Sequence, residues 1–474
     1  MNIQEINWHR LFSQSFYKNK KLPLGEMSFV KSFVNDSCSD LYPLISKSEN
    51  CREFVKDNAY HLEEGNVQRL LGQYFPYASY EITFCVKQGS CGFVFHIPGA
   101  QASVICNANS VSFTTDEYEE LIPYEDTADS RTLIVTCRRN HFDVYFLQNG
   151  VARFFHTFYT ESFAHCSSQT VFQQGFVSVC ATACVTIYAA SFYIDCGVGQ
   201  ADLRPVHYEN GDVLHENGNI YLTFSIRMQE NGFQGIFSWR PGTSQLELTG
   251  VLFFDCGDGI WRNYLASSLM YNRKTKQWYI WVSAFENQVR LAWGAFDGNP
   301  LYGVNVVDVT VMDAAGDGDG YQDFVGFRGD EDPDFYYNEE ENKWYMAICR
   351  LDPNTRAYRY AFFSSNDPFT GYRYIGCGKD DASETGGSFV TVGGQRLFVC
   401  GNAFNKRANY RIYTKDSMFD AKFDFDDGGF RGWGSIIPVQ IGSRMRYFWI
   451  TFDRQKGSDY TWSYGNIYCF EGIL

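Results

Sequence analysis

The second half of the chain repeats one short pattern five times, and this repetition constrains the fold more than any other feature. In each repeat a turn leads into an aromatic-rich strand, and a partner strand follows. The aromatic strands are NIYLTFSI (219–226), QWYIWVSAF (277–285), KWYMAICR (343–350), QRLFVCG (395–401) and MRYFWITF (445–452). They recur at intervals of roughly 50 to 66 residues, and multi-stranded repeats of that period are typical of β-propellers. We therefore predict a five-bladed propeller over residues 197–474, with a strand from 197–208 completing the last blade.

The composition favours an all-β chain, because Phe, Tyr and Trp make up 18% of it and aromatic residues prefer strands. Residues 50–196 contain short strands of alternating polarity, and Asn149-Gly150 between two of them is typical of a tight hairpin. The order of these strands resembles the concanavalin-like jelly-roll sandwich. Such a sandwich either binds glycans or only packs against a neighbour, and both roles stay open. Residues 1–49 show no pattern that assigns them to a fold.

Charge and composition exclude several classes of partner. The formal net charge is −15 and no Lys/Arg-rich run occurs, so a nucleic acid would be repelled. No uninterrupted apolar stretch of about 18 residues predicts a membrane span, and the N-terminus lacks the apolar core of a signal peptide. The 15 cysteines are odd in number, and many lie in apolar strands, as Cys137 and Cys400 do. We read them as buried thiols and expect a reducing, cytoplasmic location; the sequence does not determine the oligomeric state.

The distribution of histidine limits the chemistry. All 8 histidines lie at or before His215, so the propeller beyond its first turn contains none. A histidine-dependent nucleophile or zinc site is hard to assemble there. Acid–base chemistry must then come mainly from Asp, Glu, Tyr or Lys, and we predict no metal and no cofactor.

Carboxylates precede the aromatic strands of three repeats. They are Asp212 in the first repeat, Asp332 in the third and Glu384 in the fourth. Because turns before such strands converge on the central channel of a propeller, we expect these three side chains to form one site. Each has a plainer interpretation as a turn residue: Asp212 follows Asn-Gly, and Asp332 precedes Pro. Three neighbours also compete for the role of Asp332, namely Asp330, Glu331 and Asp334.

On these residues, the propeller half resembles the five-bladed glycoside hydrolases that include arabinanases, α-L-arabinofuranosidases and β-xylosidases, with invertase-like enzymes as more distant relatives. Those families place an Asp at the start of the first blade, an Asp in a later blade and a Glu after it. The segment SSNDPFTGYRYIG (364–376) also resembles the one that commonly separates the second Asp from the Glu. The chain departs from the pattern in two ways. The first motif is usually Asp-Pro, whereas Asp212 precedes Val213, and the sandwich comes before the propeller.

The resemblance implies hydrolysis of short oligosaccharides or glycosides, with a pentofuranoside or a xyloside as the substrate. Glu384 would be the general acid, Asp212 would activate water in an inverting reaction, and Asp332 would orient the sugar and tune Glu384. Carboxyls about 5 Å apart would instead give a retaining enzyme, which can transfer sugar. Two other interpretations stay open. A propeller that binds glycans without catalysis predicts carboxylates that point apart or form salt bridges, and a phosphorylase or transglycosidase needs a different co-substrate.

Other side chains are candidates for contacts with substrate. Trp261 and Arg262 in the second repeat, and Trp433 in the fifth, hold positions that correspond to the carboxylate motifs. An aromatic ring stacks on a sugar and a guanidinium binds hydroxyls or carboxylates, although Trp261 fits core packing nearly as well. Arg227 is a further candidate, and with Arg204 and Arg262 it could form the anion pocket of a phosphorylase. The oxygen-rich loop 313–323 fits either a tight solvated loop or a calcium site.

Overall fold

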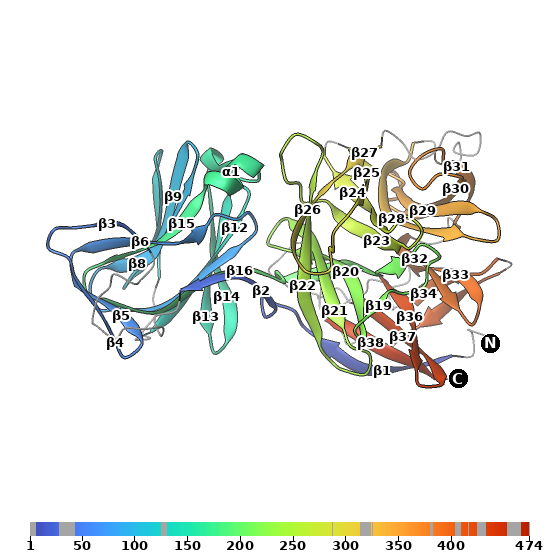
Figure 1. Cartoon of the computed structure of the whole chain (residues 1–474), viewed down its shortest axis with the longest axis horizontal. Coiled ribbons are helices and arrows are strands. Elements are labelled where there is room, and N and C mark those ends of the chain that lie inside the picture. Colours follow the sequence, from blue (N-terminus) through green and yellow to red (C-terminus); the bar gives the residue numbers. More distant parts are fainter. Residues whose placement is uncertain are drawn as a thin grey trace. The chain divides into compact units, whose positions relative to one another are not determined.

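The chain is an all-β protein made of two compact units (Figure 1). The computed structural model describes residues 6–27, 43–124, 130–286, 288–312, 324, 326–379, 383–402, 409–415, 417–423, 433–452 and 466–473. The propeller unit comprises Met1–Lys20, Cys196–Asp258 and Arg262–Leu474. The two-sheet unit comprises Lys21–Asp195 and Gly259–Trp261. The helices of the described residues are short: η3 (Glu161–Phe163) and α1 (Gln169–Gln174).

The two-sheet unit consists of two antiparallel sheets. In order across the first sheet, its strands are β11 (Glu119–Pro123), β10 (Ser110–Thr115), β9 (Ala100–Asn107), β8 (Ser90–Ile97), β15 (Phe176–Thr182), β6 (Asn66–Gln73) and β3 (Leu44–Lys47). Across the second they are β14 (Val151–Tyr159), β13 (His141–Gln148), β12 (Arg131–Arg138), β7 (Ser79–Val86), β16 (Val185–Asp195), β5 (Ala59–Glu64) and β4 (Arg52–Lys56), and β2 (Lys21–Met27) pairs with β16.

Aromatic side chains join these two sheets. Tyr80 on β7 packs against Phe93 and Phe95 on β8, with ring centroids 6.1 and 5.3 Å apart. Phe142 on β13 also packs against Phe95, at 5.1 Å. Because alternate residues of a strand point to the same face, these rings form one layer between the sheets. The assignment of this unit to the concanavalin-like jelly roll stays a prediction.

The propeller unit contains five sheets, as the repeats predicted, and each sheet is one blade. Blade 1 contains β17 (Gly199–Pro205), β20 (Asn219–Arg227), β21 (Gly232–Trp239), β22 (Leu246–Asp255) and β26 (Gly303–Asp308), with β19 (His215–Glu216) beside β20. Blade 2 contains β18 (His207–Tyr208), β23 (Leu265–Asn272), β24 (Gln277–Phe285), β25 (Val289–Phe296) and β27 (Thr310–Val311). Blade 3 contains β28 (Arg328–Asn338), β29 (Lys343–Leu351), β30 (Tyr358–Ser365) and β31 (Arg373–Cys377).

The last two blades have four strands each. Blade 4 contains β32 (Glu384–Val392), β33 (Gln395–Asn402), β34 (Asn409–Tyr413) and β35 (Met418–Lys422). Blade 5 contains β36 (Trp433–Ile441), β37 (Arg444–Phe452), β38 (Ile467–Ile473) and β1 (Asn7–Gln14). The innermost strands β17, β23, β28, β32 and β36 contact one another in that order, and β36 contacts β17, so the ring is closed.

The strand that completes the last blade comes from the start of the chain. β1 pairs antiparallel with β38, with Asn7 opposite Ile473 (Figure 1). The prediction that residues 197–208 complete this blade is therefore wrong. The aromatic strands are the second strands of their blades, so each needs an inner strand before it, and residues 199–205 supply that inner strand for blade 1. Part of the unassigned segment 1–49 thus belongs to the propeller.

Large side chains fill the space between neighbouring blades. Trp281 of blade 2 packs against Phe335 of blade 3, with ring centroids 6.2 Å apart. Trp449 of blade 5 packs against Tyr410 of blade 4 at 4.5 Å. Such dense packing holds the inner strands in fixed positions, and the site described below is built on these strands.

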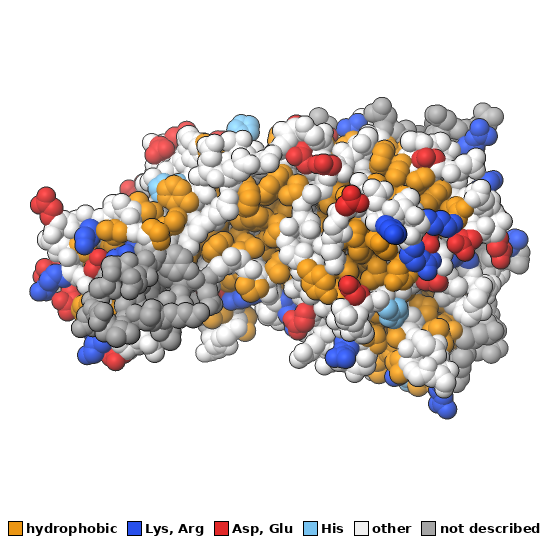
Figure 2. All heavy atoms as spheres, viewed as in Figure 1, with side chains coloured by type: hydrophobic (Ala, Val, Ile, Leu, Met, Phe, Trp, Pro, Cys, Tyr) orange, Lys and Arg blue, Asp and Glu red, His pale blue; other side chains and the backbone are white. Residues whose placement is uncertain are grey.

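The described surface and thiols bear on the partners and the location that the sequence predicted. On the face drawn in Figure 2, acidic and basic side chains of the propeller unit are interspersed and do not form a single basic tract. Within the described ranges, no helix is long and apolar enough to cross a bilayer. The cysteines of the described residues are free thiols, and many of them are buried.

Candidate active site

Four inner strands share a backbone irregularity close to their first residues. Each shifts register against its neighbour at this point, and one residue there has a positive φ: Asp202 (55°), Ala266 (56°), Asp332 (53°) and Gly386 (64°). We call these four residues the bulge layer. A left-handed conformation costs a non-glycine residue roughly 1–2 kcal/mol, and such strain concentrates at functional sites. The strained conformation recurs around the channel, and Asp202 and Asp332 are the two bulge-layer residues with carboxylate side chains.

Two backbone N–H groups of the bulge layer are bound by serine side chains of the preceding blade. Ser225 Oγ on β20 accepts a hydrogen bond from the N–H of Ala266 at 2.9 Å. Ser283 Oγ on β24 accepts one from the N–H of Asp332 at 2.9 Å. A bulge removes its extra residue from the sheet ladder, so these hydroxyls satisfy donors that would otherwise be unpaired and buried.

Arg204 binds the carbonyl groups at the same level. Its fully buried guanidinium donates to the carbonyl oxygens of Asp332 at 2.9 Å, Gly387 at 3.1 Å and Ala266 at 3.4 Å. One side chain of blade 1 therefore ties together blades 2, 3 and 4 at the centre of the ring. Each of the three guanidinium nitrogens of Arg204 therefore already donates one hydrogen bond to the backbone.

Asp202 is the main residue that sequence reasoning missed. It is 3% exposed, and its Oδ2 accepts a hydrogen bond from Arg227 Nη2 at 3.2 Å. Its Oδ1 has no hydrogen-bond partner among the described residues. Burial raises the pKa of Asp202, the charge of Arg227 opposes that rise, and the charge of Asp332 adds to it. The motif Asp202-Leu203-Arg204-Pro205 was available in the sequence, but it lay in the strand that we had assigned to the last blade.

Asp332 is held from blades 3 and 4. Its Oδ2 accepts hydrogen bonds from Thr385 Oγ1 at 3.0 Å, from the N–H of Gly386 at 3.4 Å and from Cys349 Sγ at 3.4 Å. Cys349 occupies in β29 the position that Ser225 and Ser283 occupy in β20 and β24. The carboxylate of Asp332 is thus fixed directly beside the first residues of β32.

The three neighbours that competed with Asp332 differ in their partners. Asp334 accepts hydrogen bonds from Ser268 Oγ and from the N–H of Phe389, both at 2.6 Å. Asp330 forms an ion pair with Arg350 at 3.0 Å. Glu331 is half-buried, and no hydrogen bond or ion pair joins its carboxyl to the described residues. Burial, followed by the charges of Asp332 and Asp202, raises the pKa of Glu331 to about 8.

Glu384 begins β32 and is fully buried. Its Oε1 forms an ion pair with Arg411 Nη1 at 3.3 Å and accepts a hydrogen bond from the hydroxyl of Tyr413, and its Oε2 lies 3.5 Å from the N–H of Tyr360. Burial raises the pKa of Glu384, while Tyr413 and Arg411 lower it. A methyl group added at Gly378 would lie 2.0 Å from Oε2, so the carboxyl is tightly enclosed.

The structure does not bring Asp212 together with Asp332 and Glu384. β17 runs from Gly199 through Asp202 to Pro205, and Asp212 follows in the turn beyond its end. Asp212 is exposed and exchanges two hydrogen bonds with the side chain of Asn210, at 2.8 and 3.1 Å. It is a turn residue, which was the plainer interpretation. It also lines a cavity of about 540 Å³ together with residues that end β32 and β36, at the opposite end of the channel.

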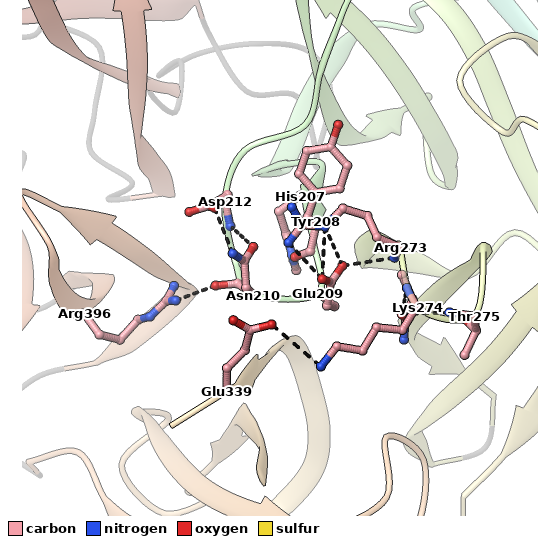
Figure 3. A network of polar contacts seen from close by, with 11 residues as sticks. His207, Tyr208, Glu209, Asn210, Asp212, Arg273, Lys274, Thr275, Glu339 and Arg396 are labelled. Atoms are coloured by element: carbon pink, nitrogen blue, oxygen red, sulfur yellow. Dashed lines mark hydrogen bonds and ion pairs between the residues drawn. The ribbon is translucent and has the colours of Figure 1, made fainter. Parts of the chain in front are cut away.

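Contacts from other blades hold this turn in place (Figure 3). The carboxylate of Glu209 binds Arg273 of blade 2 at 2.8 Å, and the carbonyl of Asn210 accepts from Arg396 of blade 4 at 2.5 Å. The same ion pair with Arg273 lowers the pKa of Glu209 against the effect of its burial. The loop therefore fastens blade 1 to its neighbours, and this accounts for its polar residues without a catalytic role.

Trp261 belongs to the two-sheet unit. Its ring packs against Phe172 at 4.7 Å and Phe75 at 5.9 Å, and 8% of its surface is exposed. The core-packing interpretation fits these contacts, and we do not assign Trp261 to a substrate-binding surface.

The remaining candidates lie in different surroundings. Arg227 is the one that the structure brings to the carboxylates, through Asp202. Arg262 binds both oxygens of Asp258, at 2.8 and 2.6 Å. Only the backbone of Trp433, which begins β36, is described. Loop 313–323 lies outside the described residues, and within the described part no group of three or more His, Cys, Asp or Glu is placed to hold a metal.

Comparison with known proteins gives a similarity of fold alone. No family model and no curated protein matches the sequence. The solved structures that are similar include the α-L-arabinofuranosidase from Lactobacillus brevis, at 12% identity, covering 59% of this chain and 92% of that one with a TM-score of 0.41. A family-43 β-1,3-galactosidase has 11% identity, coverage of 56% and 90%, and a TM-score of 0.40. A family-117 glycoside hydrolase from Zobellia galactanivorans has 11% identity, coverage of 58% and 84%, and a TM-score of 0.38. The neighbours are of the kind that the sequence resembles, but at these values the chemistry has to be argued from the site itself.

Proposed function

We propose that this protein is a glycoside hydrolase that acts on short oligosaccharides or glycosides by carboxylate acid–base catalysis. One observation carries the proposal. Asp202 and Asp332 occupy the same position of the bulge layer in two blades, with Glu331 beside them. Cleavage of a glycosidic bond needs one carboxyl that donates a proton and one carboxylate that acts on the other face of the sugar. Environments that separate the pKa values of neighbouring carboxyls are how such roles are divided.

Asp202 has the features of the base. Its Oδ2 is anchored by Arg227, while its buried Oδ1 is unpaired among the described residues and can accept a proton from water. Asp332 is held by three donors and supplies negative charge without needing to move. The proton donor is then Glu331 or Glu384, the two glutamates at this end. We propose an inverting reaction, with water activated by Asp202, and a pentofuranoside or a xyloside as the substrate that the sequence resemblance favours.

A glycan-binding propeller without catalysis is the second candidate function, and the ion pair between Glu384 and Arg411 favours it. This ion pair and the tight enclosure of the Glu384 carboxyl keep it from contact with a substrate, as a propeller that only binds would allow. A phosphorylase is less well supported, because the three arginines that would bind phosphate already have partners. Arg204 binds three carbonyl groups, Arg227 binds Asp202 and Arg262 binds Asp258.

The test is hydrolysis of a panel of aryl glycosides, including arabinofuranosides, xylosides and galactosides, with and without phosphate. We expect the wild type to cleave at least one member without phosphate, and Asp202→Asn to lose at least about a hundredfold in kcat/KM. Asp212→Asn is the matched control, because it makes the same change at the other end of the channel. Glycan binding without cleavage would replace the proposal with the binding function, and a requirement for phosphate would indicate a phosphorylase.

A further inference from the structure

Two glutamates at the beginning of the inner strands differ in access and in partners. Glu384 is fully buried, and both of its oxygens are engaged by Arg411, Tyr413 and the N–H of Tyr360. A general acid must reach the oxygen that it protonates, directly or through one water. A carboxyl enclosed in this way reaches no substrate without breaking its ion pair.

Glu331 has the opposite properties. The residue is partly exposed as a whole, unlike Glu384, and its carboxyl is joined to none of the described residues by a hydrogen bond or an ion pair. It lies between two register shifts of β28, so the backbone here leaves the regular sheet. A methyl group added at Gly329 would lie 3.2 Å from its Oε1, and the absence of a side chain at Gly329 leaves room for the carboxyl.

We propose that Glu331, and not Glu384, is the proton donor of this site. The inference rests on the proposed function and assigns a residue within it. The Glu331 carboxyl gives its proton to the glycosidic oxygen as the bond from that oxygen to the anomeric carbon breaks, and the bonding electrons stay on the departing oxygen. Asp202 removes a proton from the water whose oxygen attacks the same carbon. The products are an alcohol and a sugar with a free anomeric hydroxyl, and the proton on Asp202 returns to Glu331 through solvent.

The charges around Glu331 support this role. The groups that act on it come from three neighbouring strands and its own: Asp202 on β17, Arg227 on β20, Cys349 on β29, and Asp330 and Asp332 on β28. Burial is the largest cause of the raised pKa of Glu331; the carboxylates add to it and Arg227 only partly opposes it, which raises the pKa to about 8. The carboxyl therefore carries its proton at neutral pH, which is the form that a general acid needs.

The experiment compares Glu331→Gln with Glu384→Gln on two substrates of the same sugar, one with an alkyl and one with a dinitrophenyl leaving group. The alkyl leaving group needs protonation and the dinitrophenyl group does not. We expect Glu331→Gln to lower kcat/KM at least about a hundredfold on the alkyl glycoside, to change the dinitrophenyl reaction far less, and to abolish the alkaline limb of the pH profile near pH 8. Glu339→Gln, on the exposed turn of the same blade, is the control.

The outcomes test the proposed function and the assignment of Glu331 separately. Suppose that the wild type is active and that Glu384→Gln, rather than Glu331→Gln, shows the leaving-group dependence. That result would overturn the inference and leave the proposed function intact. A wild type that cleaves no glycoside would refute the function and the inference with it. Carbon-13 NMR of labelled glutamate gives a measurement that does not need activity. A carboxyl titrating near pH 8 must be present in the wild type and absent in Glu331→Gln, and its absence from the wild type would also overturn the inference.

Discussion

Arg204→Met is the substitution that most directly tests how the ring is held together. The change keeps an unbranched side chain but removes the guanidinium that binds the carbonyls of Ala266, Asp332 and Gly387. A buried acceptor left unpaired costs roughly 1–3 kcal/mol, so three carbonyls correspond to about 3 to 9 kcal/mol. The loss also removes positive charge from beside Asp202, Asp332 and Asp334, whose negative charges raise the pKa of Arg204. Domain stabilities are about 5–15 kcal/mol, so this variant should be severely destabilised.

The assay is urea unfolding at pH 7, followed by tryptophan fluorescence. Arg240→Met is the matched control, because Arg240 is exposed in the same unit and exposed substitutions usually change stability by less than about 0.5 kcal/mol. Arg204→Lys, which keeps the charge but not the planar fork of donors, should lie between the two. A free energy of unfolding for Arg204→Met that is within about 0.5 kcal/mol of the Arg240→Met value would refute the view that this side chain ties the blades together.

Three further predictions concern the carboxylates. The raised pKa of Glu331 contributes stability that is present below its ordinary pKa and is lost as the pH rises through about 8. The free energy of unfolding of Glu331→Gln, measured by urea titration, should therefore rise relative to that of the wild type between pH 5 and about pH 9. A difference between the two proteins that does not change with pH would contradict this. Gly378→Ala places a methyl group 2.0 Å from the Glu384 carboxyl and should cost about 1–3 kcal/mol, measured as a lower Tm, whereas an unchanged Tm would show that Glu384 moves freely. Cys349→Ser should keep the donor to Asp332 and retain activity, whereas Cys349→Ala should lower kcat with unchanged circular dichroism; equal activity of the two would remove Cys349 from the site.

The blades could be predicted because their second strands carry a strong local pattern. Strands such as 277–285 and 445–452 are continuous apolar and aromatic runs, and these runs recur at a regular interval. The inner strands have no such pattern. β17 and β28 contain charged residues that face the channel, and their bulges disrupt the alternation by which a strand is recognised. The pairing of β1 with β38 was beyond prediction for another reason, because it depends on residues at opposite ends of the chain and on no local pattern.

The site was predicted in part for the same physical reason. Asp332 binds Thr385, the residue after Glu384, and both carboxylates precede their aromatic strands by a similar distance, while their joint role in a site stays a prediction. Asp212 also precedes its aromatic strand, but the turn that contains it lies between β17 and β20, beyond the end of the inner strand. Distance along the sequence does not distinguish the two ends of the channel. Asp202 could be recognised only once its strand was known to be the innermost one.

The completion of blade 5 by β1 makes the two-sheet unit an insertion within the propeller sequence. β1 is made before the two-sheet unit, and its partner β38 is made after all the other described strands of the propeller, so blade 5 stays incomplete until β38 has been made. During that time β1 lacks its partner, and an unpaired edge strand invites pairing with another chain. Pairings between residues so far apart are also slow to form. Expression of residues 197–474 alone would leave blade 5 permanently incomplete, and the isolated fragment would pair its open edge with other copies and aggregate.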